Sequence, residues 1–324
     1  VESLPPCFPQ FDKFAKTIED AAIQQQQSLR TSYFGLASFI TSHVETTSAI
    51  TNETWPTVSL PFFRDYAGYI LEETSTEVVN VLRVVNREDR AAWEQYSVDH
   101  YQEMVAEAHM IENGNMNDLY PVGFEPYIKQ FAADQSGFER DADDIDVHYV
   151  SWEFAPAPAT YGMLNWNSMG SRPGLEFLDA LLEVKTEIMF FQVASYGLAS
   201  GLAFTQEEHE EMHAKLPDSA VEYPHSFFFV PVRESIMDKD SPIVAVLGAG
   251  YAWDAALRNL LPDNVNGITA IVKNNCNQAY TYTIDGVEAK YQGEGDRHDS
   301  KYDKHRHDVD LGLHTDPRYE TTSG

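Results

Sequence analysis

Residues 11–44 read FDKFAKTIEDAAIQQQQSLRTSYFGLASFITSHV. Apolar side chains in this stretch recur mostly at steps of three and four residues, at Phe14, Ile18, Ala22, Leu29, Tyr33, Leu36, Ile40 and Val44. That spacing places them on one face of an α-helix. No glycine or proline interrupts residues 11–33, so we expect one helix of about 30 residues, roughly 45 Å long. It is either a core helix, alone or as half of a helical hairpin, or a stalk that carries a sensor away from a membrane.

The rest of the chain alternates between strand patterns and helix patterns. We expect strands at residues 78–85, 147–154, 161–166, 188–194 and 227–232, and helices at 87–104 and 175–185. A fresh unit is expected at Ser241, with a strand at 243–250, a helix at 253–261 and strands at 268–273, 280–284 and 287–291. Asp285-Gly286 predicts a hairpin between the last two strands. This order is typical of the α+β class with antiparallel sheets.

The expected elements divide the chain into four parts. Residues 1–54 hold the long helix, 55–238 form a larger module, 239–292 form a smaller module, and 293–324 form a charged tail or linker. The tail is expected to be irregular, because it is charged, rich in histidine and without an apolar period.

Composition narrows the classes of function. The chain has 324 residues, with 22 Lys and Arg against 51 Asp and Glu, a net charge of −29. Such a charge repels nucleic acid and anionic lipid headgroups.

The longest uncharged run, residues 188–206, contains several polar residues and glycines and predicts buried structure rather than a membrane span. The chain starts at Val1, which we interpret as a segment of a longer protein. Asn52-Glu53-Thr54 permits N-glycosylation if the chain is secreted.

Two groups of side chains offer metal ligands. His209-Glu210-Glu211-Met212-His213 matches the H-E-x-x-H pattern of zinc hydrolases, with Glu210 as the water-activating base. Further glutamates surround it and no third ligand is identifiable, which favours a solvated acidic helix. In the tail, His298, His305, His307 and His314 lie among aspartates that could bind a divalent cation. A hydrated linker is the favoured interpretation there, and we predict no metal site and no cofactor.

A small-molecule pocket is predicted around the strand at 147–154 and the segment that follows it. Aromatic residues supply contact area, and asparagine and arginine orient polar groups of a ligand. The candidate ligand-binding residues are Trp152, Tyr161, Asn165, Asn167, Arg172 and Phe228. The alternative is that the aromatic residues only pack in a core, as they commonly do on strands.

Several segments resemble a known family in their order. Leu82-Arg83-Val84-Val85, followed by the segment 87–94, resembles the strand and helix of CHASE sensor domains, and so do Arg172-Pro173-Gly174 and Phe229-Val230-Pro231-Val232. The segments at 152–158, 252–254, 261–268 and 293–303 are similar to the ectodomain of algal receptor-type nucleotide cyclases. The resemblance covers about residues 30–303.

The resemblance implies a long helix followed by two tandem PAS-like modules of the CHASE or double-Cache type. It implies an extracellular small-molecule sensor of a transmembrane receptor, with a class III guanylate or adenylate cyclase outside this chain. The segment itself would then be non-enzymatic, would dimerise through the long helix, and would meet the membrane only through flanking spans. The alternative from the residues is a zinc-dependent hydrolase that uses His209, Glu210 and His213.

Overall fold

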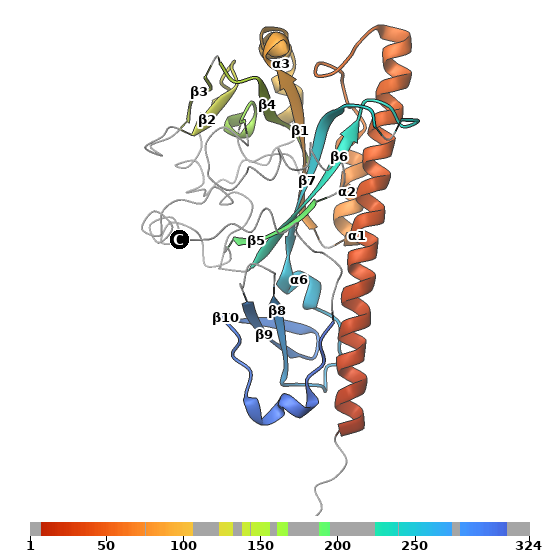
Figure 1. Cartoon of the computed structure of the whole chain (residues 1–324), viewed down its shortest axis with the longest axis vertical. Coiled ribbons are helices and arrows are strands. Elements are labelled where there is room, and N and C mark those ends of the chain that lie inside the picture. Colours follow the sequence, from red (N-terminus) through yellow and green to blue (C-terminus); the bar gives the residue numbers. More distant parts are fainter. Residues whose placement is uncertain are drawn as a thin grey trace, which may run out of the picture.

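The structure is a computed structural model, which describes residues 8–74, 76–105, 123–131, 138–142, 144–155, 161–167, 188–194, 224–238, 240–273 and 279–309. It is a mixed α+β protein in which a long helix, α1 (Phe8–Thr51), lies beside two antiparallel sheets (Figure 1). The α+β class, the antiparallel sheets and the long N-terminal helix are confirmed. At 44 residues the helix is longer than expected.

The apolar stripe of α1 faces the rest of the protein. Leu29, Tyr33, Leu36, Ile40 and Val44 are all buried. They share one hydrophobic core with residues from the large sheet, such as Leu247, and from the small sheet, such as Tyr282. The stripe is therefore used within the chain, and α1 is a core helix rather than a free-standing stalk.

The large sheet is built from strands that are distant in the sequence. Within the described residues it has the order β4-β1-β7-β6-β5, and each neighbouring pair is antiparallel. The strands are β1 (Thr76–Asn86), β4 (Val147–Ala155), β5 (Ile188–Ala194), β6 (His225–Arg233) and β7 (Ile243–Ala252). The first and last strands, β1 and β7, pair in its middle.

Helices cover both faces of the large sheet. On one face, α1 packs over β6, and α2 (Phe63–Thr74) packs over β1 and β4. On the other face, η1 (Arg87–Asp89) leads into α3 (Arg90–Val105), whose Trp93 joins a second core with Trp152 of β4. A two-stranded sheet, β2 (Lys129–Phe131) with β3 (Phe138–Arg140), adjoins this second core.

The pairing of β1 with β4 is irregular at one point. Val81 pairs with Glu153 but Leu82 pairs with Ser151, so Trp152 of β4 is the extra residue at this step. Val79 and Val81, before the step, belong to the core under α1, whereas Val85, after it, belongs to the core under α3. Residues two apart share a face in a regular strand, so β1 passes from one core to the other near this irregularity.

The boundary between the two sheets differs from the sequence prediction. The strand expected to open a fresh unit after Ser241 is β7, and it pairs with β1 and β6 in the large sheet. Its uncharged run of small and branched side chains suits a central strand buried on both faces. The small sheet starts only after α6 (Trp253–Leu257), which ends earlier than expected, ahead of Asn259 at φ 58°. Assigning β7 to the smaller module was therefore wrong.

The small sheet follows the predicted meander. Its order is β10-β9-β8, from β8 (Ile268–Lys273), β9 (Ala279–Asp285) and β10 (Glu288–Glu294). The hairpin at Asp285-Gly286 is confirmed. Gly286 has φ +62°, and a Cβ there would lie 2.9 Å from Cα of Asp263, so the turn requires glycine both for its backbone and for space.

Two further expectations were wrong. The segment expected as a strand at 161–166 contains η3 (Tyr161–Met163) and joins its neighbours only through isolated bridges, because Asn165 adopts φ 59° and breaks the extended run. The tail is not irregular from residue 293. It completes β10 and then forms η6 (Ser300–His305), whose first turn is capped by the side chain of Asp299. The helix expected at 175–185 lies outside the described residues.

The buried stripe of α1 makes a direct prediction about stability. Leu36 is fully buried, so Leu36→Ala should lower the free energy of unfolding by about 2–5 kcal/mol. Ser38→Ala, at an exposed position on the same helix, should change it by less than about 0.5 kcal/mol. Urea denaturation followed by circular dichroism measures both. Equal effects of the two substitutions would contradict the packing of α1 described above.

Candidate functional site

The predicted ligand-binding residues do not all lie together. Trp152, Asn165 and Asn167 are buried on the α3 side of the large sheet. Phe228 belongs to the other core, where its ring lies edge-on to Tyr33 at 5.7 Å between centroids. Of Tyr161 the structure describes only the backbone, at the start of η3, and Arg172 lies outside the described residues. The sheet thus separates Phe228 from the other candidates.

Trp152 is part of an aromatic layer against α3. Its ring lies 5.1 Å from Trp93 and 6.1 Å from Tyr96, measured between centroids. The indole N–H of Trp152 is buried and has no hydrogen-bond partner among the described residues. A buried donor without a partner is uncommon and costs free energy, which marks this layer as a place where a ligand atom or water would be stabilised.

Asn165 holds the framework of this region together. Its side-chain oxygen accepts a hydrogen bond from Nε1 of Trp93 at 3.1 Å, and its nitrogen donates to Oγ of Ser97 at 2.9 Å and to the carbonyl of Glu125 at 3.1 Å. Its positive φ is one that asparagine tolerates better than most residues. The amide is therefore already engaged within the protein, which favours a structural role over ligand contact.

Asn167 belongs to a buried polar chain with Asp141 and His148. Nδ2 of Asn167 donates to Oδ2 of Asp141 at 2.6 Å, and Oδ1 of Asn167 accepts from the backbone N–H of Tyr149 at 2.9 Å. Nδ1 of His148 lies 2.8 Å from the same carboxylate oxygen of Asp141. Nε2 of His148 is buried without a hydrogen-bond partner in the described part of the chain. Asp141 and His148 belong to no motif in the sequence and were not predicted as site residues.

Lys129 is the least compensated charge in this region. Its side chain is 0% exposed, and the ammonium has no hydrogen-bond or ion-pair partner among the described residues. Nζ lies 5.3 Å from the centre of the Phe138 ring. Burial lowers the pKa of Lys129 to about 8, against a smaller opposing effect of Glu125, so the amine is still mostly protonated at pH 7.

The position of Lys129 is fixed by its backbone. Its N–H donates to the carbonyl of Asn165 at 2.9 Å, and its own carbonyl accepts from the N–H of Asn167 at 2.8 Å. The Asn165 and Asn167 segment in turn bonds to Ser151, next to Trp152 in β4. Lys129 and Trp152 thus belong to one hydrogen-bonded set of segments. A lone lysine in a short strand carries no pattern, so nothing in the amino-acid order points to this site.

Arg83, unlike Lys129, is a buried cation whose charge is compensated. Its guanidinium donates to both carboxylate oxygens of Glu153 and to the carbonyl oxygens of Pro56 and Val58. The rings of Trp55 and Trp93 lie 5.4 Å from Cζ, a distance at which aromatic faces attract a cation. Arg83 has its charge neutralised inside the protein, whereas Lys129 does not.

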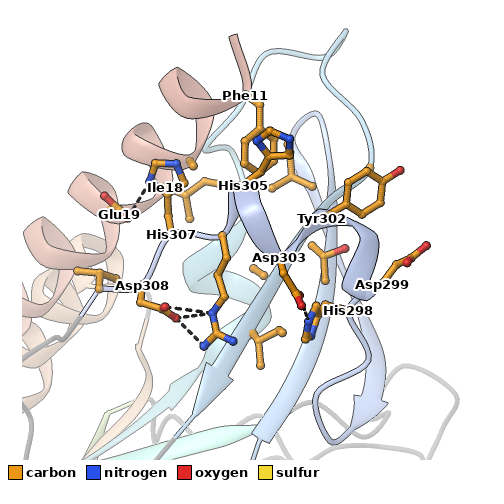
Figure 2. Close-up of a pocket in the computed structure, with 18 of the residues that line it drawn as sticks. Phe11, Ile18, Glu19, His298, Asp299, Tyr302, Asp303, His305, His307 and Asp308 are labelled. Carbon is orange, nitrogen blue, oxygen red and sulfur yellow. Dashed lines mark hydrogen bonds and ion pairs between the residues drawn. The ribbon is translucent and has the colours of Figure 1, made fainter. Parts of the chain in front are cut away.

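A separate cavity of about 580 Å³ lies at the opposite end of the protein, between the first turns of α1, strand β8 and residues 298–309. Figure 2 shows Phe11, Ile18 and Glu19 of α1 facing His305, His307 and Asp308 of the tail across it. The rings of His305 and His307 each lie 6.2 Å from the ring of Phe11. His305 and His307 therefore pack on α1, although most residues from 298 to 309 are exposed, so the linker interpretation is corrected at these two contacts.

His298 pairs with two aspartates of the tail, one of which, Asp296, also binds Lys273 of β8. Its Nδ1 pairs with Asp296, and its Nε2 lies 2.7 Å from Oδ1 of Asp303 in η6. The hydrogen bond to Asp296, followed by that to Asp303, raises the pKa of His298 above its ordinary value. Both bonds favour the charged imidazolium.

No metal centre is found among the described residues, because no three histidine, cysteine, aspartate or glutamate side chains gather closely enough there to hold an ion. The proposed zinc ligands His209 and His213, with Glu210, lie outside the described residues, as do Cys7, Cys276 and His314.

No helix in the described part combines the length and apolar character that a membrane span requires. No model of a known protein family matches the chain, and no curated protein matches it.

The ion pair of Arg83 and Glu153 predicts a non-additive mutant cycle. Arg83→Leu leaves the Glu153 carboxylate buried and unpaired, so it should cost about 3–5 kcal/mol of unfolding free energy. Replacing both residues by leucine should recover at least half of that loss, because no buried charge remains. Arg87→Leu, in the exposed pair with Asp146, should cost about 1 kcal/mol or less. Urea denaturation tests the cycle, and a double variant as unstable as the single one would contradict it.

The pairing of His298 predicts a pH dependence of the tail. Because the folded-state pKa is raised, the stabilisation is complete below the ordinary pKa of about 6.5 and is lost as pH rises through the raised value. Hydrogen-exchange protection of residues 296–305, corrected for intrinsic rates, should fall over that interval. His298→Gln should remove the dependence. A flat protection profile in the unsubstituted protein from pH 5.5 to 8.5 would show that the pairing does not anchor η6.

Proposed function

We propose that this chain is the extracellular ligand-binding part of a transmembrane receptor, and that its ligand is a small carboxylate bound on the α3 side of the large sheet. The observation that carries the proposal is the buried ammonium of Lys129, which has no hydrogen-bond partner among the described residues and is opposed only by the smaller effect of Glu125. An isolated buried charge is costly, and a bound anion would compensate it.

The surroundings of Lys129 support a ligand with an apolar body. Trp152, Trp93 and Tyr96 form an aromatic layer joined to the Lys129 strand through residues 165–167. The unpartnered N–H of Trp152 offers a second donor to a polar ligand atom. One cation, one indole donor and aromatic faces match the general make-up of a small-molecule site, which is mostly apolar with a few placed polar groups. Of the residues predicted from the sequence to bind a ligand, Trp152 is the one that we keep in the proposed site.

The architecture is compatible with two PAS-like modules, which form the finer part of the proposal. The large sheet pairs its first and last strands, β1 and β7, at its centre, as PAS-like sheets do, and a smaller antiparallel sheet follows it. The cytoplasmic effector, proposed from the resemblance alone, is a class III nucleotide cyclase outside this chain. The segment itself then binds and does not catalyse.

The extracellular location and the homodimer are also proposals. Asn52 of the sequon is exposed after the end of α1, where a glycan could be attached. The buried stripe of α1 is occupied, so a dimer through this helix would use its outer face. There Phe39 is 42% exposed and stacks on Tyr66 of α2, which is 41% exposed, at 5.1 Å. Sedimentation equilibrium of the purified chain measures the oligomeric state.

The carboxylate proposal is tested by ligand-induced thermal stabilisation of the full chain. Benzoate, phenylacetate and indole-3-acetate are compared with the corresponding amides, which keep the shape and lack the charge. At a hundred times Kd, mass action adds about 2.7 kcal/mol, a rise in melting temperature of roughly 5 °C. We expect at least one acid, and none of the amides, to give that rise.

Substitution of Lys129 separates a ligand-binding role from a structural one. Lys129→Met should abolish the ligand-induced rise while leaving the melting temperature of the free protein unchanged or higher, because it removes a buried unpaired charge. Lys290→Met, at an exposed lysine of β10, is the control and should keep the rise. Stabilisation that survives Lys129→Met, or no stabilisation by any acid, would refute the site.

A further inference from the structure

The cavity at the base of α1 has an apolar wall that its neighbours do not fill. Phe11, Ala15, Ile18 and Ala22 recur at helix spacing along α1, and Ile268 lines the cavity from β8. The cavity volume of about 580 Å³ lies within the range of small-ligand sites. His305 and His307 of the tail also line the cavity, and Figure 2 shows them beside Phe11, Ile18 and Glu19.

The cations around this cavity are already neutralised. Nζ of Lys273 lies 2.6 Å from a carboxylate oxygen of Asp296, and Nη2 of Arg306 lies 2.7 Å from one of Asp308. An anionic ligand would have to compete with these ion pairs. Repulsion from the net charge of −29 would weaken its binding further.

Among the carboxylates that line the cavity, Glu19 has no close ion pair. Glu19 is largely buried, with 16% of its side chain exposed, and its nearest cationic atoms are Nζ of Lys16 and Nδ1 of His307, both at 3.6 Å. That separation is too long for a hydrogen bond. Glu19 lies one residue from Ile18 in the apolar wall, so an acceptor adjoins an apolar surface.

We propose that this cavity binds a small organic cation, a primary amine with an aromatic or alkyl body. The ammonium donates to Glu19, while the body packs on Phe11, Ile18 and Ile268. This goes beyond the proposed function, because it concerns a second site, on the small sheet, for a ligand of opposite charge.

The ligand class is tested with three probes of one shape: 3-phenylpropylamine, 3-phenylpropanol and 3-phenylpropionate. Binding to the full chain is measured by ligand-observed NMR titration at constant ionic strength and pH 7. We expect the amine to bind at least tenfold more tightly than the alcohol and the carboxylate. Equal or tighter binding of the alcohol or the carboxylate, or no amine binding at 10 mM, overturns the proposal.

The location is tested with two substitutions that change net charge equally. Glu19→Gln should weaken amine binding at least tenfold. Asp20→Asn, at the next residue and 61% exposed, should weaken it less than twofold. Ala22→Trp should abolish binding by filling the cavity, with circular dichroism confirming that the variant is folded. Equal effects of Glu19→Gln and Asp20→Asn, or full binding by folded Ala22→Trp, would overturn the assignment.

Lys129→Met should leave amine binding intact, and Glu19→Gln should leave carboxylate stabilisation intact. Failure of this inference and failure of the proposed function are therefore distinguishable. Loss of amine binding in Lys129→Met would contradict two independent sites.

Discussion

The apolar stripe of α1 is the contact on which the rest of the structure depends. Within the described residues the large and small sheets share no hydrogen-bonded strand pair, yet both contribute to one hydrophobic core with this helix. At about 25 cal/mol per Å² of apolar surface, burying such a stripe is among the larger favourable contributions in the chain. The relative position of the sheets, and the existence of a cavity at the base of α1, both follow from that packing.

Sequence analysis predicted the elements better than their pairing. Helix periodicity is local, so α1 was recognised from its own side chains, and Asp285-Gly286 identified its hairpin. Strand pairing is not local: nothing in the composition of β7 states that it joins β1, some 160 residues earlier in the numbering. The prediction of a strand at residues 161–166 was wrong for a related reason. Asn165 is held by hydrogen bonds to Trp93 and Ser97, which lie elsewhere in the chain.

The candidate site residues also differ in whether a local pattern in the sequence reveals them. Trp152 and Asn165 were identified as members of one region, because aromatic and amide residues near one strand are visible as a pattern. The burial of Lys129 cannot be predicted from the sequence, because no local pattern distinguishes a buried lysine from an exposed one. The tail gave the opposite error: its histidines and aspartates suggested a hydrated linker, but the rings of His305 and His307 pack on Phe11.

The length of α1 gives small rotations a large effect at its base. Forty-four residues at 1.5 Å each make a rod of about 66 Å, and a tilt of about 5° pivoting at its upper end would displace its first turn by roughly 6 Å, close to one helical turn. Residues 298–309 lie against that first turn. A small rearrangement in the large sheet that tilts α1 would therefore change the distance between the first turn of this helix and residues 298–309.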